Sequence, residues 1–169
     1  SVPYMMYEKA ISCLMVNKLN QYTIDQIVLI TSPLFHSYGV ACLLEYSFSN
    51  SSIILPKEQS FIGPLKELLN KRTARIITAI EGVPYFYKQL SLIIDKTNLI
   101  KLNHIGFGGG ALNELDVNKI MNKYSNLTYS VRYGMTETPS VISLKLFKPP
   151  YKDNLKSCGK VISLYTIRI

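Results

Sequence analysis

Short apolar segments of strand length alternate with helical patterns along most of this chain, and this alternation limits the possible folds more than any other feature. The segments are apolar at consecutive positions, which is typical of strands buried on both faces. They occur at residues 26–31, 52–55, 75–80, 104–107 and 128–132. Buried strands separated by helices form βαβ units and pair in parallel. The sequence therefore predicts an α/β fold, a mostly parallel sheet with helices on both faces.

The segments between the strands carry helix signals. Apolar residues recur at steps of three and four near the start of the chain, and a second helix is expected after Gly39. Pro64 and Pro84 stand where a helix would begin, and Asn113 can cap another. After residue 150 the pattern changes to a polar segment and then to strand-like alternation over residues 161–169. We therefore expect an α/β core subdomain at residues 1–150 and the start of a β-rich segment at 151–169.

Composition excludes several classes of protein. Of the 169 residues, 47 % are hydrophobic and 18 % are charged, which argues against a disordered chain, a collagen and a coiled coil. Cys13, Cys42 and Cys158 form no CxxC pair, so a disulfide framework and a structural zinc site are not expected. Scattered cysteines suit a reducing compartment, and we expect a cytoplasmic protein. No apolar run is long enough for a transmembrane segment.

The net charge of +8 has two interpretations. One is an anionic partner, which is a nucleic acid, a membrane surface or a phosphate-bearing ligand. The other is a surface coated with lysine, because the basic residues are spread along the whole chain. No motif of a nucleic-acid-binding family and no cluster of basic residues occurs, so we expect no nucleic acid as a partner.

In a parallel sheet, ligands bind at the carboxyl ends of the strands, so the loops there are the candidate sites. These loops cover residues 32–39, 81–83, 108–112 and 133–139. The third belongs to a G-F-G-G-G-A stretch at residues 106–111, which fits either a dinucleotide-binding loop or a plain glycine turn. The following strand has no acidic residue to hold a ribose, and this disfavours a nicotinamide site.

The fourth loop has side chains that suit a nucleotide. Tyr133 offers an aromatic face, Gly134 allows close approach, Thr136 can bond to a phosphate oxygen, and Glu137 is a possible ligand of Mg²⁺. The competing interpretation is a helix N-terminus capped by Thr136. In the first loop, His36 is either a structural histidine or a functional one, and it has no partner at metal-ligand spacing.

Taken together, these loops resemble one family. SPLFHSYG at residues 32–39, EGVPYFY at 81–87, GGGAL at 108–112, YGMTET at 133–138 and SCGK at 157–160 follow one another in the family's order and spacing. The chain resembles the acyl-adenylate-forming superfamily, which includes acyl- and aryl-CoA synthetases, peptide-synthetase adenylation domains and luciferase. The Arg132–Glu137 form is most similar to the acyl-CoA synthetase branch, malonate-type enzymes included.

The resemblance implies the large N-terminal domain of an enzyme that uses ATP and Mg²⁺ to convert a small carboxylic acid to acyl-AMP. A thiol then takes the acyl group, either from CoA or from the phosphopantetheine arm of an acyl carrier protein. By resemblance, Gly109, Gly110 and Ala111 would flank one face of the adenine and Tyr133 the other. Gly134 and Thr136 would bind the nucleotide, with Thr136 in contact with the α-phosphate, and Glu137 would bind Mg²⁺. His36 and Gly108 would border the acyl pocket.

The family's lysine-bearing phosphate loop, its ribose-binding T-G-D segment and its lid domain have no counterpart in this sequence. We therefore expect an internal fragment of a ligase that is not competent alone. The alternative is a truncated, non-catalytic remnant that acts as a nucleotide-binding or interaction module.

Overall fold

A single sheet organises the molecule. The computed structural model describes residues 6–58, 60–111, 114–124, 126–139, 141–151 and 157–163. In the described residues the sheet has seven strands in the order β2-β1-β3-β4-β5-β6-β7. The strands are β1 (Ile27–Ile30), β2 (Ser52–Ile54), β3 (Ala79–Gly82), β4 (His104–Phe107), β5 (Thr128–Gly134), β6 (Val141–Phe147) and β7 (Lys160–Val161). The strands from β2 to β5 pair in parallel, and β6 and β7 are antiparallel to their neighbours.

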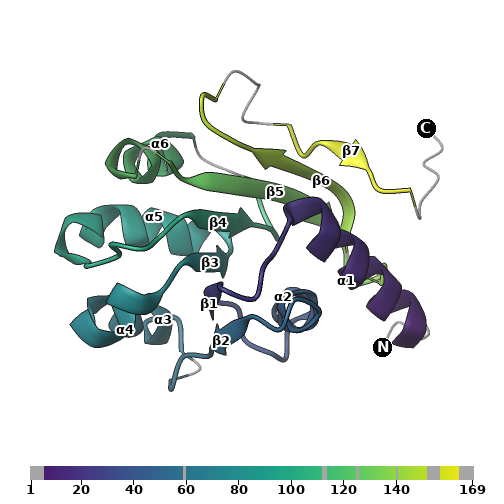
Figure 1. The fold of residues 1–169 in the computed structure, drawn as a ribbon, viewed down its shortest axis with the longest axis horizontal. Helices are drawn as coiled ribbons and strands as arrows, with labels where there is room; N and C mark the ends of the chain where they lie inside the picture. The colour runs from purple at the N-terminus through teal and green to yellow at the C-terminus, as the bar shows by residue number, and fades with distance from the viewer. Residues whose placement is uncertain are drawn as a thin grey trace.

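Helices cover both faces of the sheet (Figure 1). On one face lie α1 (Met6–Asn20) and α2 (Ser37–Ser47). On the other face lie α3 (Gly63–Leu69), α4 (Lys71–Ile76), α5 (Pro84–Ile93), a 3₁₀ turn (Ile94–Lys96) and α6 (Glu114–Lys123). This arrangement confirms the predicted α/β fold. No helix in the described part of the chain is both long and apolar enough to cross a membrane.

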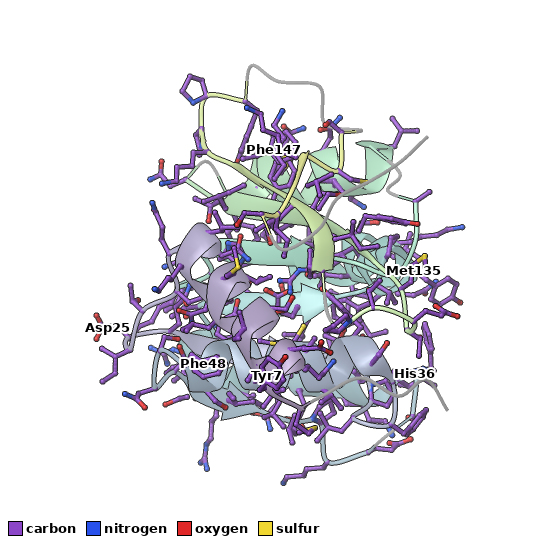
Figure 2. The ribbon with its side chains drawn as sticks, turned by 90° about the vertical axis from the view of Figure 1, so that its right-hand side faces the viewer. Tyr7, Asp25, His36, Phe48, Met135 and Phe147 are labelled. Carbon is purple, nitrogen blue, oxygen red and sulfur yellow. The ribbon has the colours of Figure 1, made fainter. Side chains whose placement is uncertain are left out.

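The central strands are buried on both faces, as their continuous apolar sequences predict. Leu29 and Ile80 join a large core with Tyr87 of α5. Their neighbours Val28 and Ile30 point the other way and join a smaller core with residues of α2. This packing holds the strands rigidly, so their carboxyl ends form a fixed edge. In Figure 2 the side chains of His36 and Met135 lie at one end of the molecule, and those of Asp25 and Phe48 lie at the other.

One predicted strand is shorter than expected. Residues 75–80 were expected to be extended, but Arg75 and Ile76 belong to helix α4. The Asn70 side chain caps this helix by accepting hydrogen bonds from the amides of Arg72 (3.0 Å) and Thr73 (3.4 Å). The cap outweighs the strand preference of the β-branched residues, and the strand begins only at Ala79.

Other elements extend beyond the predicted boundaries. Glu81 was expected in a loop but lies within β3, and Tyr133 and Gly134 belong to β5. Strand β6 was not predicted at all; it pairs antiparallel with β5 and supplies Val141 and Leu144 to a small core with α1. The predicted helix cap at Asn113 and most of the predicted strand at 161–169 fall outside the described residues.

Candidate active site

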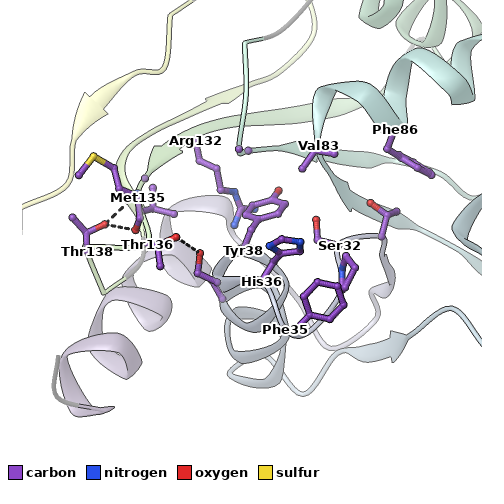
Figure 3. Close-up of a pocket in the computed structure, with 18 of the residues that line it drawn as sticks. Ser32, Phe35, His36, Tyr38, Val83, Phe86, Arg132, Met135, Thr136 and Thr138 are labelled. Carbon is purple, nitrogen blue, oxygen red and sulfur yellow. Dashed lines mark hydrogen bonds between the residues drawn. The ribbon is translucent and has the colours of Figure 1, made fainter. Parts of the chain in front are cut away.

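A cavity of about 700 Å³ lies at the carboxyl ends of the parallel strands. Its walls come from α1, the β1–α2 loop, the start of α5, the turn after β4 and the loop after β5 (Figure 3). These segments are far apart in the sequence and meet because parallel strands place their carboxyl ends at one edge. The loops predicted as candidate sites therefore border the same cavity.

The β1–α2 loop holds His36 at the cavity. The amide of His36 donates to the carbonyl of Pro33 at 3.0 Å, which closes a turn before the helix. A Cβ at Gly39 would overlap the carbonyl oxygens of Ser32 and Pro33, so the turn needs glycine there. The imidazole of His36 is exposed and lies 4.7 Å from the ring of Phe35. This is the position of a lining residue rather than of a histidine packed in the core.

The glycine turn after β4 borders the same cavity. Gly109 has a φ of +76°, a conformation that side-chain-bearing residues rarely adopt. Gly108 and Gly109 line the cavity, and the ring of Tyr38 packs directly against Gly108. Gly110 and Ala111 are exposed and lie outside the lining.

The loop after β5 is a compact turn. The hydroxyl of Thr138 donates to the carbonyl of Met135 at 2.9 Å, and the hydroxyls of Thr136 and Ser37 are 3.3 Å apart. Lys9 of α1 donates to the carbonyl of Pro139 at 2.9 Å, so the loop is attached to both α1 and α2. No helix follows in the described residues, because β6 begins at Val141. The helix-cap interpretation of Thr136 is therefore wrong.

Six of the predicted site residues line the cavity together: His36, Gly108, Gly109, Gly134, Thr136 and Glu137. Glu137 is exposed, so its carboxylate is accessible to a ligand. Tyr133 is 48 % exposed and, like Gly110 and Ala111, stands outside the lining. No three His, Cys, Asp or Glu side chains come together as a metal site in the part of the chain that the structure describes.

The structure also contains a buried charged cluster that the sequence reasoning missed. Arg132, at the floor of the cavity, forms ion pairs with Glu45 and with Glu81, the latter at 2.9 Å. All three side chains are buried. The hydroxyls of Tyr22 and Tyr38 donate to Glu81 at 2.8 and 3.0 Å. The sequence does contain a signal for this cluster, because each of the three charged residues stands alone among apolar residues. Such residues are buried, and buried charges need partners of opposite charge.

The two carboxyls of this cluster titrate differently. Burial would raise the pKa of Glu81, but Arg132, the nearby His104 and the hydrogen bond from Tyr22 outweigh it and lower that pKa to about 2. For Glu45, burial prevails over Arg132 and raises the pKa to about 7. The difference lies in the hydrogen bonds that the two carboxylates accept. Glu81 accepts hydrogen bonds from the hydroxyls of three tyrosines, whereas one oxygen of Glu45 is buried without a hydrogen bond.

The arrangement combines an open rim of backbone, hydroxyl and carboxylate groups with an apolar interior. A rim of this kind suits a phosphate-bearing ligand, because glycine turns admit close approach and hydroxyls bond phosphate oxygens. The apolar lining is contributed by Pro33, Phe35, Ala41, Phe61, Pro64, Val83 and Phe86, of which Phe35 and Phe61 are exposed. Such a cavity can hold a molecule with an anionic end at the rim and an apolar body below it.

Comparisons with known proteins agree with this geometry. The model of the AMP-binding enzyme family matches residues 4–169. 4-Coumarate-CoA ligase 1 of Narcissus pseudonarcissus is 26 % identical over 149 residues, which are 86 % of this chain and 27 % of the ligase. Luciferin 4-monooxygenase of Photinus pyralis is 26 % identical over 153 residues, 89 % of this chain and 26 % of that protein.

A similar solved structure is O-succinylbenzoate Coenzyme A Synthetase (MenE) from Bacillus subtilis in complex with AMP. It has a TM-score of 0.65 and 26 % identity, covering 92 % of this chain and 30 % of the synthetase. A second structure of that enzyme is a complex with ATP and magnesium ion. The chain spans about a quarter of the length of the curated relatives. Because the family model matches almost every residue, this chain belongs to the AMP-binding enzyme family.

Proposed function

We propose that this chain is part of an ATP-dependent ligase that activates a carboxylic acid as acyl-AMP and then forms an acyl thioester. The observation that supports this most strongly is the convergence of four family segments on one cavity that has both polar and apolar lining residues. An acyl-adenylate has the same division, because its phosphate is anionic and its acyl body is apolar. We also propose a cytoplasmic location.

Under this proposal, Gly109, Gly110 and Ala111 border one face of the adenine and Tyr133 borders the other. Thr136 bonds to the α-phosphate, and its distance of 3.3 Å from Ser37 supports a fixed hydroxyl position. The exposed carboxylate of Glu137 fits a magnesium ion that is shared with phosphate oxygens. When bound, the ion would neutralise charge that builds up on those oxygens.

The acid would occupy the interior, next to His36 and Gly108. The thiol acceptor is CoA or the phosphopantetheine arm of a carrier protein. The names of the relatives leave two classes of acid open, because 4-coumarate carries one carboxylate and O-succinylbenzoate carries two. Either acid has an aromatic body that suits the apolar walls of the cavity.

The test is isothermal titration of this chain with ATP and Mg²⁺, comparing the wild type with Glu137→Gln. We expect weak binding by the wild type and at least ~tenfold weaker binding by the variant, equivalent to ~1.4 kcal/mol. Asp25→Asn is the matched control, since it also removes one exposed carboxylate and lies at the opposite end of the molecule (Figure 2). Equal affinities for wild type and Glu137→Gln would contradict the metal role of Glu137.

A further inference from the structure

The cation at the floor of the cavity, Arg132, is already paired with two carboxylates of the protein. The guanidinium of Arg132 is buried and makes ion pairs with Glu45 through Nη1 and with Glu81 through Nη2. Nη2 also donates to the hydroxyl of Tyr22 at 2.9 Å. The ring of Tyr38 lies beside the guanidinium, 5.4 Å from its central carbon (Figure 3). Both terminal nitrogens of Arg132 are therefore occupied, while its buried Nε has no hydrogen-bond partner among the described residues.

The charges of this cluster leave no surplus of positive charge at the floor. Arg132 contributes one positive charge, and the low pKa of Glu81 keeps its carboxylate ionised. Glu45 adds either nothing or a second negative charge, because its pKa is about 7. A substrate carboxylate at the floor would lose its hydration without gaining an ion pair, which is strongly unfavourable.

The other cation that lines the cavity is Lys9. Its ammonium donates to the carbonyl of Pro139, just beyond Thr136 and Glu137, and its charge also acts on the Glu45 carboxyl. The interior walls between rim and floor are mostly aromatic, proline and aliphatic side chains. The hydrogen bond to Pro139 holds the Lys9 ammonium to the loop where the reacting carboxylate and the phosphate would lie.

Glu81 reaches this place because of the neighbouring strand. A Cβ at Gly106 of β4 would overlap the Glu81 carboxyl group, so only glycine leaves room for it. The same carboxylate accepts the Tyr38 hydroxyl at 3.0 Å, and Tyr38 packs on Gly108. Glu81 thus holds both the cation and the aromatic ring that form the floor.

We propose that Glu81 determines the substrate class of this site: by pairing with Arg132 and fixing Tyr38, it restricts the acyl pocket to monocarboxylic acids whose far end is uncharged. Acids with a second carboxylate at the far end are excluded. This inference rests on the proposed function, because it takes the interior of the cavity to be the acyl pocket.

The experiment measures binding of two matched acids to the 169-residue chain by ligand-observed NMR. The probes are 3-phenylpropanoate and 4-(2-carboxyethyl)benzoate, which differ by one carboxylate at the far end of the ring. We expect the wild type to bind the monoacid at least ~tenfold more tightly. In Glu81→Gln the floor loses one negative charge and Arg132 keeps only Glu45 as an ion-pair partner, so the floor becomes more positive. The preference should then fall to about threefold or less.

Two further variants separate charge from shape. Asp25→Asn should keep the wild-type preference. Tyr46→Phe removes a hydroxyl that donates to Glu81 at 2.9 Å but removes no charge, and Tyr46 does not line the cavity, so its preference should stay within about twofold of the wild type. A loss of preference in Tyr46→Phe would overturn the assigned role of the Glu81 charge, and this holds even if Glu81→Gln does not fold.

The remaining outcomes distinguish the inference from the proposed function. Equal binding of the two acids, or tighter binding of the diacid, by the wild type overturns the inference. If ATP and Mg²⁺ bind but neither acid does, the inference also fails, while the nucleotide part of the proposed function stands. If neither the acids nor ATP bind, the proposed function fails with it.

Discussion

Replacing Arg132 by Met tests whether the buried cluster is held together by charge. Methionine keeps an unbranched apolar side chain at the position, so the change mainly removes the guanidinium. Glu81 would still accept hydrogen bonds from Tyr22 at 2.8 Å and Tyr46 at 2.9 Å. Glu45 would lose its ion pair and already has one buried oxygen without a hydrogen bond. Removing one member of a buried ion pair costs ~3–5 kcal/mol, and we expect a loss in this range at about pH 8.

The cost should depend on pH in a defined direction. In the variant, both carboxyls lose the cation that favours their charged forms, so their pKa values rise and they take up protons at mildly acid pH. Protonation removes the buried charge, and the loss of stability should shrink by ~1–2 kcal/mol between about pH 8 and pH 5.5.

The assay is urea unfolding at both pH values, followed by far-UV circular dichroism and by the fluorescence of the twelve tyrosines, since the chain has no tryptophan. A double-mutant cycle with Glu45→Gln isolates the Arg132–Glu45 pair, and we expect a coupling of at least ~1 kcal/mol. A cost below ~1 kcal/mol at both pH values would refute the reasoning, because it would mean that the cluster is hydrated or rearranged.

Two other substitutions follow from the same geometry. The pKa of Glu45 is raised from 4.5 to about 7 in the folded state, so the folded chain binds more protons than the unfolded chain between these pH values. The stability of the wild type should therefore fall as pH rises from about 4.5 to 7. Glu45→Gln should remove this pH dependence, as measured by urea unfolding across that range; an unchanged slope would contradict the raised pKa. Gly108→Ala would place a Cβ 2.5 Å from the Tyr38 ring. It should weaken 3-phenylpropanoate binding at least ~fivefold by NMR titration, and unchanged binding would exclude Tyr38 as the floor of the pocket.

The convergence of the loops could be predicted from the sequence because it depends on local patterns. Consecutive apolar residues such as those of β1 indicate buried parallel strands, and parallel strands place their following loops at one edge. The sequence therefore predicts that His36, Gly108 and Thr136 lie near one another, and all three line the cavity. Strand β6 was missed because Pro139 and the turn before it had suggested a loop or a helix start.

The pairing within the charged cluster could not be predicted, because the partners are far apart in the sequence. Arg132 is 87 residues from Glu45 and 51 residues from Glu81 in the sequence. Nothing local indicates which buried charge meets which, since the partners come from a helix and from two strands that are not adjacent in the sheet. The sheet order decides the pairing, because β3 and β5 lie on either side of β4.

The sheet order also explains the glycines of β4 and of the turn that follows it. In the G-F-G-G-G-A stretch, only Gly109 has the positive φ expected of a ligand-binding turn. Gly106 leaves space for the Glu81 carboxyl, and Gly108 leaves space for the Tyr38 ring. The side chains of Glu81 in β3 and Arg132 in β5 meet over β4, which lies between these strands. A side chain on β4 at that point would occupy the same space, and glycine has none. The motif that suggested a dinucleotide site is therefore as much a consequence of the cavity floor as of the nucleotide rim.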